Sequence, residues 1–352
     1  MDKLSLKRRG FNLGMVSIKR DGGDELSNWR SGKPVFLAKA CSSELIKHAD
    51  SIAQSKLLYQ AVLAGQQCDP ILAEKPYCDR LDIQFESLGS SINEGDKQEI
   101  ETVLFDAVEG DTVLAEDLWM KVSWLSFYEQ DNSLRFRFSF GIDFEEDVAA
   151  DLQRQNLAAE LTDAVFPESS IIIKNNKLID KIKVILDCEK ISFVERIIYF
   201  NSPEGGAYLH HDRERGHAGV VYAQLSGVTF WLALPKLQLL QEIESFVAAC
   251  VSSKQWPETL DNAMQNELKQ LVANQNQLSA ELDSFCNDTL ILLINETHMF
   301  IQQLIRNGHG QTVQAGDVLL LPQESDLTCC WHSVFCLGDE AGQALSFAIR
   351  RV

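Results

Sequence analysis

The chain has 352 residues, which is enough to bury a full hydrophobic core and to form one large domain or two. Its shares of hydrophobic (45%) and charged (24%) residues are those of an ordinary soluble globular protein. Asp and Glu number 51 against 32 Lys and Arg, and the resulting formal charge of −19 disfavours nucleic acid and anionic lipid as general partners.

No segment predicts export or insertion into a membrane. The first nine residues are basic, but no apolar segment of signal-peptide length follows them. The longest apolar run, Thr289–Ile294, is far shorter than the roughly 18 residues of a membrane span. The nine cysteines are scattered and lack the C-x-x-C spacing. We therefore expect a cytoplasmic protein with no membrane contact.

The first 65 residues predict a loop region, a strand and a helix, in that order. The first forty residues are rich in loop formers and end in Gly32–Ala38, a turn that leads into a short apolar strand. A helix is predicted to begin at Ser42, and its apolar stripe continues to Leu63 before Gly65 ends it.

The middle of the chain predicts mostly strands. Apolar and polar residues alternate in Leu81–Phe85 and in Leu134–Phe140, whereas residues 145–163 have the pattern of a helix. Three β-branched runs, typical of strands, then follow in succession: Ser170–Ile173, Lys181–Leu186 and Phe193–Phe200.

A helical block interrupts the strands of the C-terminal half. Val220–Gly227 and Val228–Pro235 look like a strand pair that turns at Ser226-Gly227. Residues 237–307 are rich in Leu, Gln and Glu, almost free of Gly and Pro, and apolar at helical spacing. Strands return at Gly316–Pro322, Trp331–Leu337 and Ala344–Ile349. This order favours an antiparallel barrel with a helical insert over alternating βαβ units.

Three residues near the ends of these strands form a candidate metal site. Residues i and i+2 of a strand share a face, so His210 and Asp212 can bind one ion while His211 points away. His332 lies in a later strand. Two imidazoles and one carboxylate are the facial ligand set that holds Fe(II) and leaves positions open for a cosubstrate and oxygen.

The segments around these residues resemble the cupin-like, JmjC-related family of Fe(II)/2-oxoglutarate-dependent oxygenases. They are similar to its H-x-D segment, its Q-x-x-G-x-x-x-W-x-L-x-P strand pair and its G-D-x-L-x-x-P and W-H-x-V segments. The match is ordered over residues 193–350, and residues 65–190 match nothing in the family. The matching segments are Leu209–Asp212, Gln224–Pro235, Gly316–Pro322 and Trp331–Val334, with a weaker echo at Gly32–Leu37.

The resemblance implies a mainly β fold with α decoration (α+β). Its core is a double-stranded β-helix (cupin or jelly roll) over residues 166–352, with the helical insertion 237–307 between the ligand-bearing strands. Residues 1–165 then form an α+β region that packs on the barrel and partly completes it. The resemblance also implies a hydroxylase-type dioxygenase that uses Fe(II), 2-oxoglutarate and O2, with three metal ligands that are also its catalytic residues: His210, Asp212 and His332.

The chain departs from the family at the anchor of the cosubstrate. Relatives often place a Lys two residues after the Gly of the strand pair, and here that position is Thr229. An arginine elsewhere is then needed for the far carboxylate, because a guanidinium grips a carboxylate bidentately. Arg350 on the last strand is the first choice and Arg196 the second, with Thr229 or Tyr199 adding a hydroxyl. A surface charge is the alternative role for Arg350.

Two other functions stay open. One is a cupin-like metalloprotein that does not use 2-oxoglutarate, which Thr229 favours. The other is a metal-free interaction protein that keeps the barrel and binds partners through its helical block. The substrate is an amino acid, a small metabolite, a peptide or a protein side chain, and the sequence does not select among them. The apolar spacing of the helical insert fits either a homodimer contact or a roof over the active site.

Overall fold

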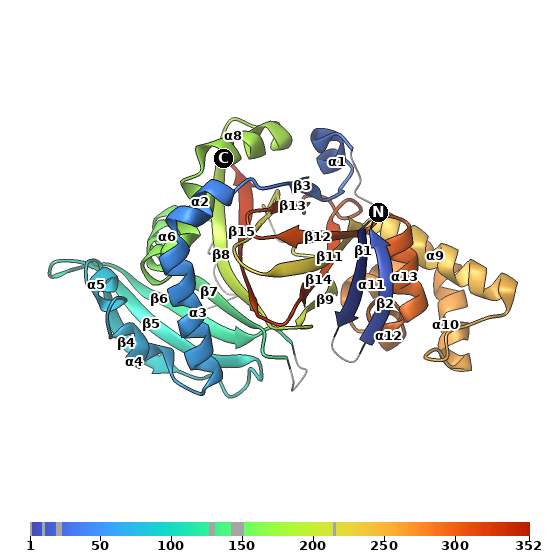
Figure 1. Ribbon diagram of the computed structural model, residues 1–352, viewed down its shortest axis with the longest axis horizontal. Helices are drawn as coiled ribbons and strands as arrows, with labels where there is room; N and C mark the ends of the chain where they lie inside the picture. Colours follow the sequence, from blue (N-terminus) through green and yellow to red (C-terminus); the bar gives the residue numbers. More distant parts are fainter. Residues whose placement is uncertain (1, 9–10, 19–22, 127–130, 142–150, 214–215) are drawn as a thin grey trace.

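Two β-sheets face each other at the centre of the molecule, and helices lie on both sides of them (Figure 1). The structure, a computed structural model, describes residues 2–8, 11–18, 23–126, 131–141, 151–213 and 216–352. The larger sheet has nine strands and the smaller has four. A separate antiparallel hairpin consists of β1 (Asp2–Arg8) and β2 (Phe11–Ile18).

The larger sheet is antiparallel throughout. The sheet joins strands from the first third of the chain to strands from its end. In spatial order its strands are β3 (Val35–Leu37), β13 (Val318–Pro322), β10 (Gly219–Gln224), β15 (Gly342–Arg351), β8 (Ile191–Asn201), β7 (Leu134–Phe140), β6 (Thr112–Trp124), β5 (Glu99–Glu109) and β4 (Phe85–Ser91).

The smaller sheet packs against the C-terminal half of the larger one. Tyr222 of the larger sheet and Trp231 of the smaller lie edge to face, with ring centroids 4.5 Å apart. Both belong to one buried cluster that also holds Leu319 and Val334. In spatial order the four strands are β12 (Gly310–Gln314), β11 (Val228–Pro235), β14 (Cys330–Leu337) and β9 (Gly206–His210).

From β8 onward, consecutive strands alternate between the two sheets, except that β11 and β12 lie side by side in the smaller sheet. The predicted pairing of Val220–Gly227 with Val228–Pro235 is therefore wrong, since β10 and β11 belong to opposite sheets. Gly227 makes the crossing with a positive φ of 72°. A Cβ there would lie 2.9 Å from the Cα of Gly342, so a side chain would strain this turn.

Five helices fill the interval between β11 and β12, which confirms the predicted helical block. Buried residues of α9 follow helical spacing, with Leu239, Ile243, Phe246 and Cys250 on one side, and they share a core with Phe230 of β11. The helices cover the outer face of the smaller sheet. They are α9 (Lys236–Ser253), α10 (Asn262–Val272), α11 (Gln275–Ser284), α12 (Asp288–Glu296) and α13 (His298–Arg306).

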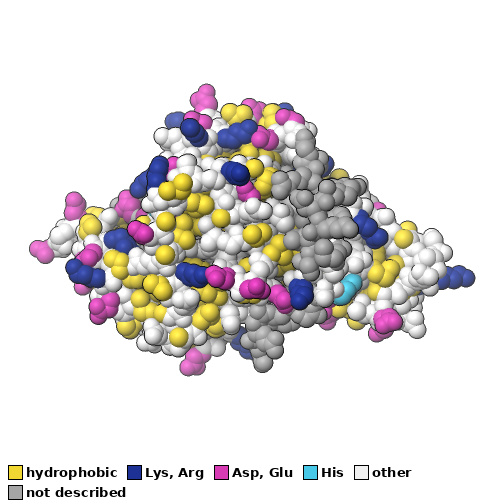
Figure 2. All heavy atoms as spheres, in the orientation of Figure 1, with side chains coloured by type: hydrophobic (Ala, Val, Ile, Leu, Met, Phe, Trp, Pro, Cys, Tyr) yellow, Lys and Arg dark blue, Asp and Glu magenta, His cyan; other side chains and the backbone are white. Residues whose placement is uncertain are grey.

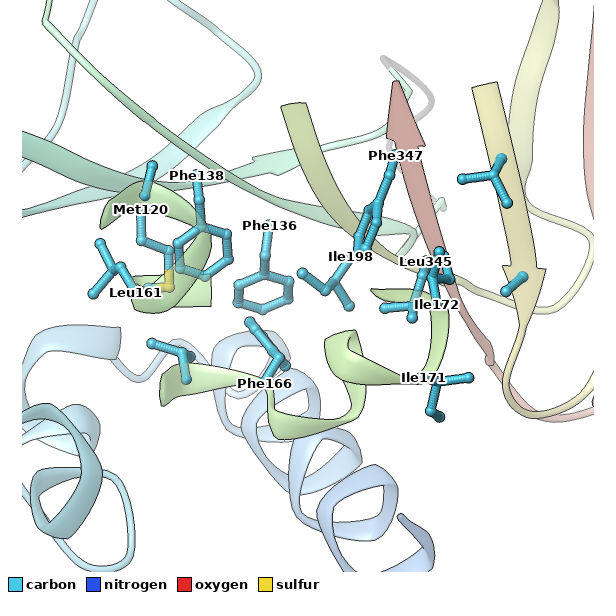
Figure 3. Packing of buried hydrophobic residues seen from close by; sticks show 14 of the residues in the cluster. Met120, Phe136, Phe138, Leu161, Phe166, Ile171, Ile172, Ile198, Leu345 and Phe347 are labelled. Carbon is cyan, nitrogen blue, oxygen red and sulfur yellow. The ribbon is translucent and has the colours of Figure 1, made fainter. Parts of the chain in front are cut away.

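A second group of helices covers the other face of the larger sheet. Figure 3 shows Phe136 and Phe138 of β7 against Phe166 and Leu161, and the rings of Phe136 and Phe166 meet edge to face at 5.1 Å. The elements of this N-terminal half are α1 (Glu25–Arg30), α2 (Ser42–Lys47), α3 (Ala49–Leu63), α4 (Cys68–Leu72), α5 (Cys78–Leu81), α6 (Leu152–Val165), η1 (Pro167–Ser169), α7 (Ser170–Ile173) and α8 (Asn176–Leu186).

Two of the three β-branched runs are helical and not strands. Ser170–Ile173 is α7, and Lys181–Leu186 is the second half of α8. The Asn175 side chain caps α8 by accepting a hydrogen bond from the backbone N–H of Leu178. The burial pattern of this segment is that of a helix, because Ile182 and Ile185 are buried whereas Val184 is 68% exposed.

Two further predictions differ from the structure, and a third is confirmed over the residues that the structure describes. The first forty residues contain the hairpin β1–β2, whose Leu6 and Leu13 are buried in the core that the later helices build. Leu81–Phe85 is not a strand, since α5 ends at Leu81 and β4 begins at Phe85. The predicted helix 145–163 corresponds to α6, and residues 145–150 lie outside the described residues.

The surface carries the charges in a mixed arrangement. Figure 2 shows acidic and basic side chains interspersed over one face of the molecule. Among the described residues, no helix has both the length and the hydropathy that a membrane crossing requires.

Glu168 gives the stability of this core a dependence on pH. The buried carboxyl accepts hydrogen bonds from Ser55 and, at 2.6 Å, from Gln343 of β15. Burial raises its pKa above the ordinary 4.5, although these hydrogen bonds oppose the shift. The unfolded chain thus releases the proton first, and stability falls as the pH rises above 4.5 towards the raised pKa.

We expect Glu168→Gln to remove this fall. The free energy of unfolding of the variant, relative to that of the wild type, should increase between pH 4 and pH 8 in urea titrations. The exposed Glu86→Gln provides the control and should leave the difference constant. If the free energies of unfolding of the wild type and of Glu168→Gln vary with pH in parallel, the raised pKa of Glu168 is not the source of the fall.

Candidate metal centre

The two candidate histidine ligands lie on strands that are direct neighbours in the smaller sheet. His210 is the last residue of β9, and it is the antiparallel partner of His332 in β14. Asp212 follows β9 in residues 211–213, which belong to no strand. The pairing of β9 with β14 therefore brings the two histidines together in space, although they are far apart in the sequence.

A β-bulge adjusts this pairing. His332 pairs with His210, but Val334 pairs with Ala207, so β9 carries one extra residue between the two pairs. The freed backbone N–H of Leu209 donates to the Asn295 side chain of α12 at 2.8 Å. A bulge re-aims the side chains near it, and here it lies next to the ligand His210.

The three side chains converge on a single point. His210 Nε2 lies 3.4 Å from Asp212 Oδ1, and His332 Nε2 lies 3.3 Å from Asp212 Oδ2. One ligand atom from each residue falls within 4.8 Å of the others. Within the described residues this is the one group of three or more His, Cys, Asp or Glu side chains with such spacing.

The hydrogen bonds of both imidazoles direct the same ring nitrogen at this point. His210 Nδ1 lies 2.6 Å from the carbonyl of Tyr208, and His332 Nδ1 lies 3.3 Å from the carbonyl of Cys330. A carbonyl only accepts, so each Nδ1 carries a proton, and each Nε2 faces Asp212 as the ring nitrogen available to a metal ion. This arrangement fits a divalent metal ion bound by two imidazoles and a carboxylate.

The charge state of Asp212 suits the same role. Burial acts to raise the pKa of this carboxyl, but the adjacent His332 and His210 outweigh burial and hold the pKa well below its usual range. Asp212 is therefore ionised at neutral pH, and the ionised carboxylate is the form that binds a metal.

A cavity of about 930 Å³ opens onto the three ligands. Its inner walls are mostly apolar and aromatic, and Trp231 stacks on the ring of His332 with centroids 5.5 Å apart. Charged side chains line it as well: Arg135, Arg137, Glu195, Glu204 and Glu296.

The structure separates the residues predicted to bind the cosubstrate. Tyr199 of β8 lines the cavity, whereas Arg196 on the same strand faces α6, where its Nη1 pairs with Asp163 at 3.2 Å. Residues three apart on a strand face opposite sides, so Tyr199 and Arg196 do not serve one site. Among the described residues that line the cavity, neither Arg196 nor Arg350 is present, and Arg350 lies beside Gly216.

Thr229 lies on the inward face of β11 but is fully buried behind the cavity wall. Its hydroxyl donates to Gln224 Oε1 at 2.9 Å and accepts from Trp231 Nε1 at 2.9 Å. Both functions of the hydroxyl are therefore engaged within the protein.

Sequence reasoning missed Arg135. This residue of β7 pairs with Tyr199 of β8 and lines the cavity. Within the described part of the chain, its guanidinium makes no hydrogen bond and no ion pair. The signal was the alternation Leu134-Arg135-Phe136-Arg137, which places the apolar residues in the core and both arginines on the opposite face.

Arg135 and Asp212 both influence the pKa of the Tyr199 hydroxyl. Burial raises the pKa of Tyr199, Asp212 raises it further, and Arg135 and Arg137 act in the opposite direction. The net shift is upward, so the hydroxyl keeps its proton and can donate a hydrogen bond inside the cavity. Tyr199 thus lies within electrostatic reach of the candidate metal ligand Asp212 and of the two arginines.

Comparisons with known proteins give a limited result. No protein-family model and no curated protein sequence matches the chain. Matching solved structures include Escherichia coli YcfD (13% identity, TM-score 0.31), ribosomal oxygenase YcfD (12%, 0.32), and YcfD in complex with cobalt and succinic acid (12%, 0.31). They cover 95–96% of this chain, which spans about half of their length, 53–54%.

These neighbours are oxygenases, as is the family that the sequence motifs resemble. A TM-score near 0.3 assigns neither a fold nor a function to this chain. The case for a function therefore rests on the site itself.

We expect the three ligands to bind a divalent ion together. His210→Ala and His332→Ala should each weaken Co(II) binding by more than about a hundredfold, because changing a residue that merely supports a ligand already costs about 10–100-fold. Co(II) titration followed by visible absorption measures this. His48→Ala, which removes a histidine outside the cavity, should bind Co(II) like the wild type. Equal Co(II) binding by the wild type and all three variants would contradict the prediction that these residues form a metal site.

Proposed function

We propose that the chain is an Fe(II)- and 2-oxoglutarate-dependent oxygenase of the hydroxylase type. The observation that carries the proposal is the convergence of His210, Asp212 and His332, with both Nε2 atoms aimed at the carboxylate and a cavity in front of them. This donor set is the one that non-haem Fe(II) oxygenases use.

The strand order supports a double-stranded β-helix as the catalytic core of this proposal. Strands that alternate between two facing antiparallel sheets are the pattern of a jelly roll. In this interpretation residues 166–352 form the core, 237–307 are its helical insertion, and 1–165 extend the larger sheet with β7, β6, β5 and β4.

The residues divide into two functional groups. His210, Asp212 and His332 would hold Fe(II) and leave its other positions facing the cavity. Arg135 would pair with the far carboxylate of 2-oxoglutarate, and Tyr199 would donate a hydrogen bond to it. A guanidinium that lines the cavity, with no partner among the described residues, supports this assignment over Arg350.

Bound Fe(II) with 2-oxoglutarate and O2 supplies the oxidation of a substrate C–H bond, with succinate and carbon dioxide as the other products. The chain supplies an apolar wall beside the site, because Trp231, Tyr222 and Leu321 line the cavity and His332 is only 4% exposed, whereas the side chains of His210 and Asp212 stay in contact with solvent. The cavity holds more than a small dicarboxylate needs, which leaves room for part of a substrate. An amino acid, a peptide, a protein side chain and a small metabolite all fit this space.

One observation favours a second candidate, a cupin-like metalloprotein that does not use 2-oxoglutarate. Thr229 stands where relatives often carry a Lys, and its hydroxyl is already bonded to Gln224 and Trp231. The two candidates share the metal site and differ in the cosubstrate.

Anaerobic titration with Fe(II) and 2-oxoglutarate separates them. The oxygenase should develop the weak visible charge-transfer band of the chelate. Arg135→Gln should need about 10–100-fold more 2-oxoglutarate for half of the band, because a hydrogen bond to a charged group contributes about 1.5–3 kcal/mol. Co(II) affinity should not change in this variant.

Arg30→Gln, at an exposed position outside the cavity, is the matched control. The same loss in Arg350→Gln, with Arg135→Gln unaffected, would transfer the anchoring role to Arg350. Iron binding with no band in the wild type would instead select the metalloprotein without 2-oxoglutarate.

A further inference from the structure

A fully buried lysine lies behind the metal centre. Lys236 is the first residue of α9, and its side chain has no solvent exposure. Its ammonium lies 2.5 Å from Asp283 Oδ2 and 3.4 Å from Asp326 Oδ2. Burial of an ammonium is unfavourable unless carboxylates compensate for the lost water, so the three residues hold one another in place.

Each of the two carboxylates also faces a residue next to Asp212. The other oxygen of Asp283 lies 3.9 Å from His211 Nε2, and the other oxygen of Asp326 lies 3.1 Å from Arg213 Nη1. His211 and Arg213 are the two chain neighbours of the metal ligand. The network His211–Asp283–Lys236–Asp326–Arg213 therefore ties both chain neighbours of Asp212 to α9, to α11 and to the loop before β14.

The tautomer of His211 fits this network. Its Nδ1 accepts the backbone N–H of Arg213 at 3.2 Å, so the proton of the neutral ring is on Nε2, the atom nearest Asp283. The facing oxygen Asp283 Oδ1 is buried and has no hydrogen-bond partner among the described residues. A small movement of either side chain would complete this bond.

The end of α11 also supports the second histidine ligand. Phe285, just past α11, stacks on Trp331 at 5.1 Å, and Trp331 directly precedes His332. The ring of His211 meets the same Trp331 at 5.1 Å. Phe285 ends α11 in the left-handed conformation common at helix C-termini, with a φ of 49°, and its side chain is 42% exposed.

We propose that Lys236, Asp283 and Asp326 are positioning residues of the metal centre, through which the helical insertion sets the orientation of Asp212. The proposal rests on the metal site of the proposed function. Residues 211–213 belong to no strand, so no backbone ladder fixes the ligand carboxylate, and side-chain contacts must do so. Supports of this kind set the geometry and affinity of a metal site.

Two variants test the proposal, with Co(II) as the probe. Asp283→Asn removes the charge that faces both Lys236 and His211. Arg213→Gln breaks the opposite arm at a side chain that is 40% exposed, where loss of the ion pair should not unfold the protein. Both variants should bind Co(II) about 10–100-fold more weakly and shift the visible absorption bands of the bound ion. Glu281→Gln, on the same helix as Asp283, is the control and should match the wild type.

Thermal unfolding of the metal-free proteins separates positioning from simple destabilisation. The positioning role is supported if Arg213→Gln melts like the wild type but binds Co(II) more weakly with altered bands. It is overturned if Arg213→Gln keeps the wild-type affinity and spectrum, even where Asp283→Asn is destabilised. If the wild type shows no Co(II) binding that depends on His210 and His332, the metal site itself fails, and both proposals fall together.

Discussion

Antiparallel pairing of β9 with β14 is the constraint on which the candidate metal centre depends. It places His210 opposite His332, although the helical insertion separates the two in the chain. The strand β9 does not hold its position alone, because it is at the edge of the smaller sheet and its bulge needs Asn295 of α12 to satisfy a freed N–H. Helices α9–α13 and the residues at their ends thus contact the candidate site at three places: the bulge, the network around Lys236, and the aromatic contact at Trp331.

The sequence was sufficient for the parts of the site that local geometry determines. Alternation along a strand selected His210 over His211 as the partner of Asp212, and the structure places His211 on the other side, against Trp331. The helical block could also be predicted, since apolar residues at helical spacing without Gly or Pro are typical of helices. The β-branched runs Ser170–Ile173 and Lys181–Leu186 misled, because burial at helical spacing outweighs the preference of single residues for strands.

The other residues of the candidate site are brought together by tertiary pairing, which local sequence patterns do not predict. Arg135 matters because β7 joins the larger sheet beside β8, a neighbour relation that no local pattern announces. The same holds for Lys236, Asp283 and Asp326, which come from the start of one helix, the end of another and the loop before β14. Arg196 shows the converse, since alternation relative to Tyr199 already argues that the two face opposite sides.

The alternation of strands between the two sheets also has a kinetic consequence. Val35 of β3 pairs with Leu320 of β13, and β8 pairs with β15, so the larger sheet closes only when distant parts of the chain meet. Loops of that length must be ordered before their contacts compensate for the lost entropy, and such topologies fold slowly. The helices between β11 and β12 also depend on a distant segment, since α13 packs on β2 near the N-terminus. The candidate metal ligands come together only once β14 has docked between β11 and β9.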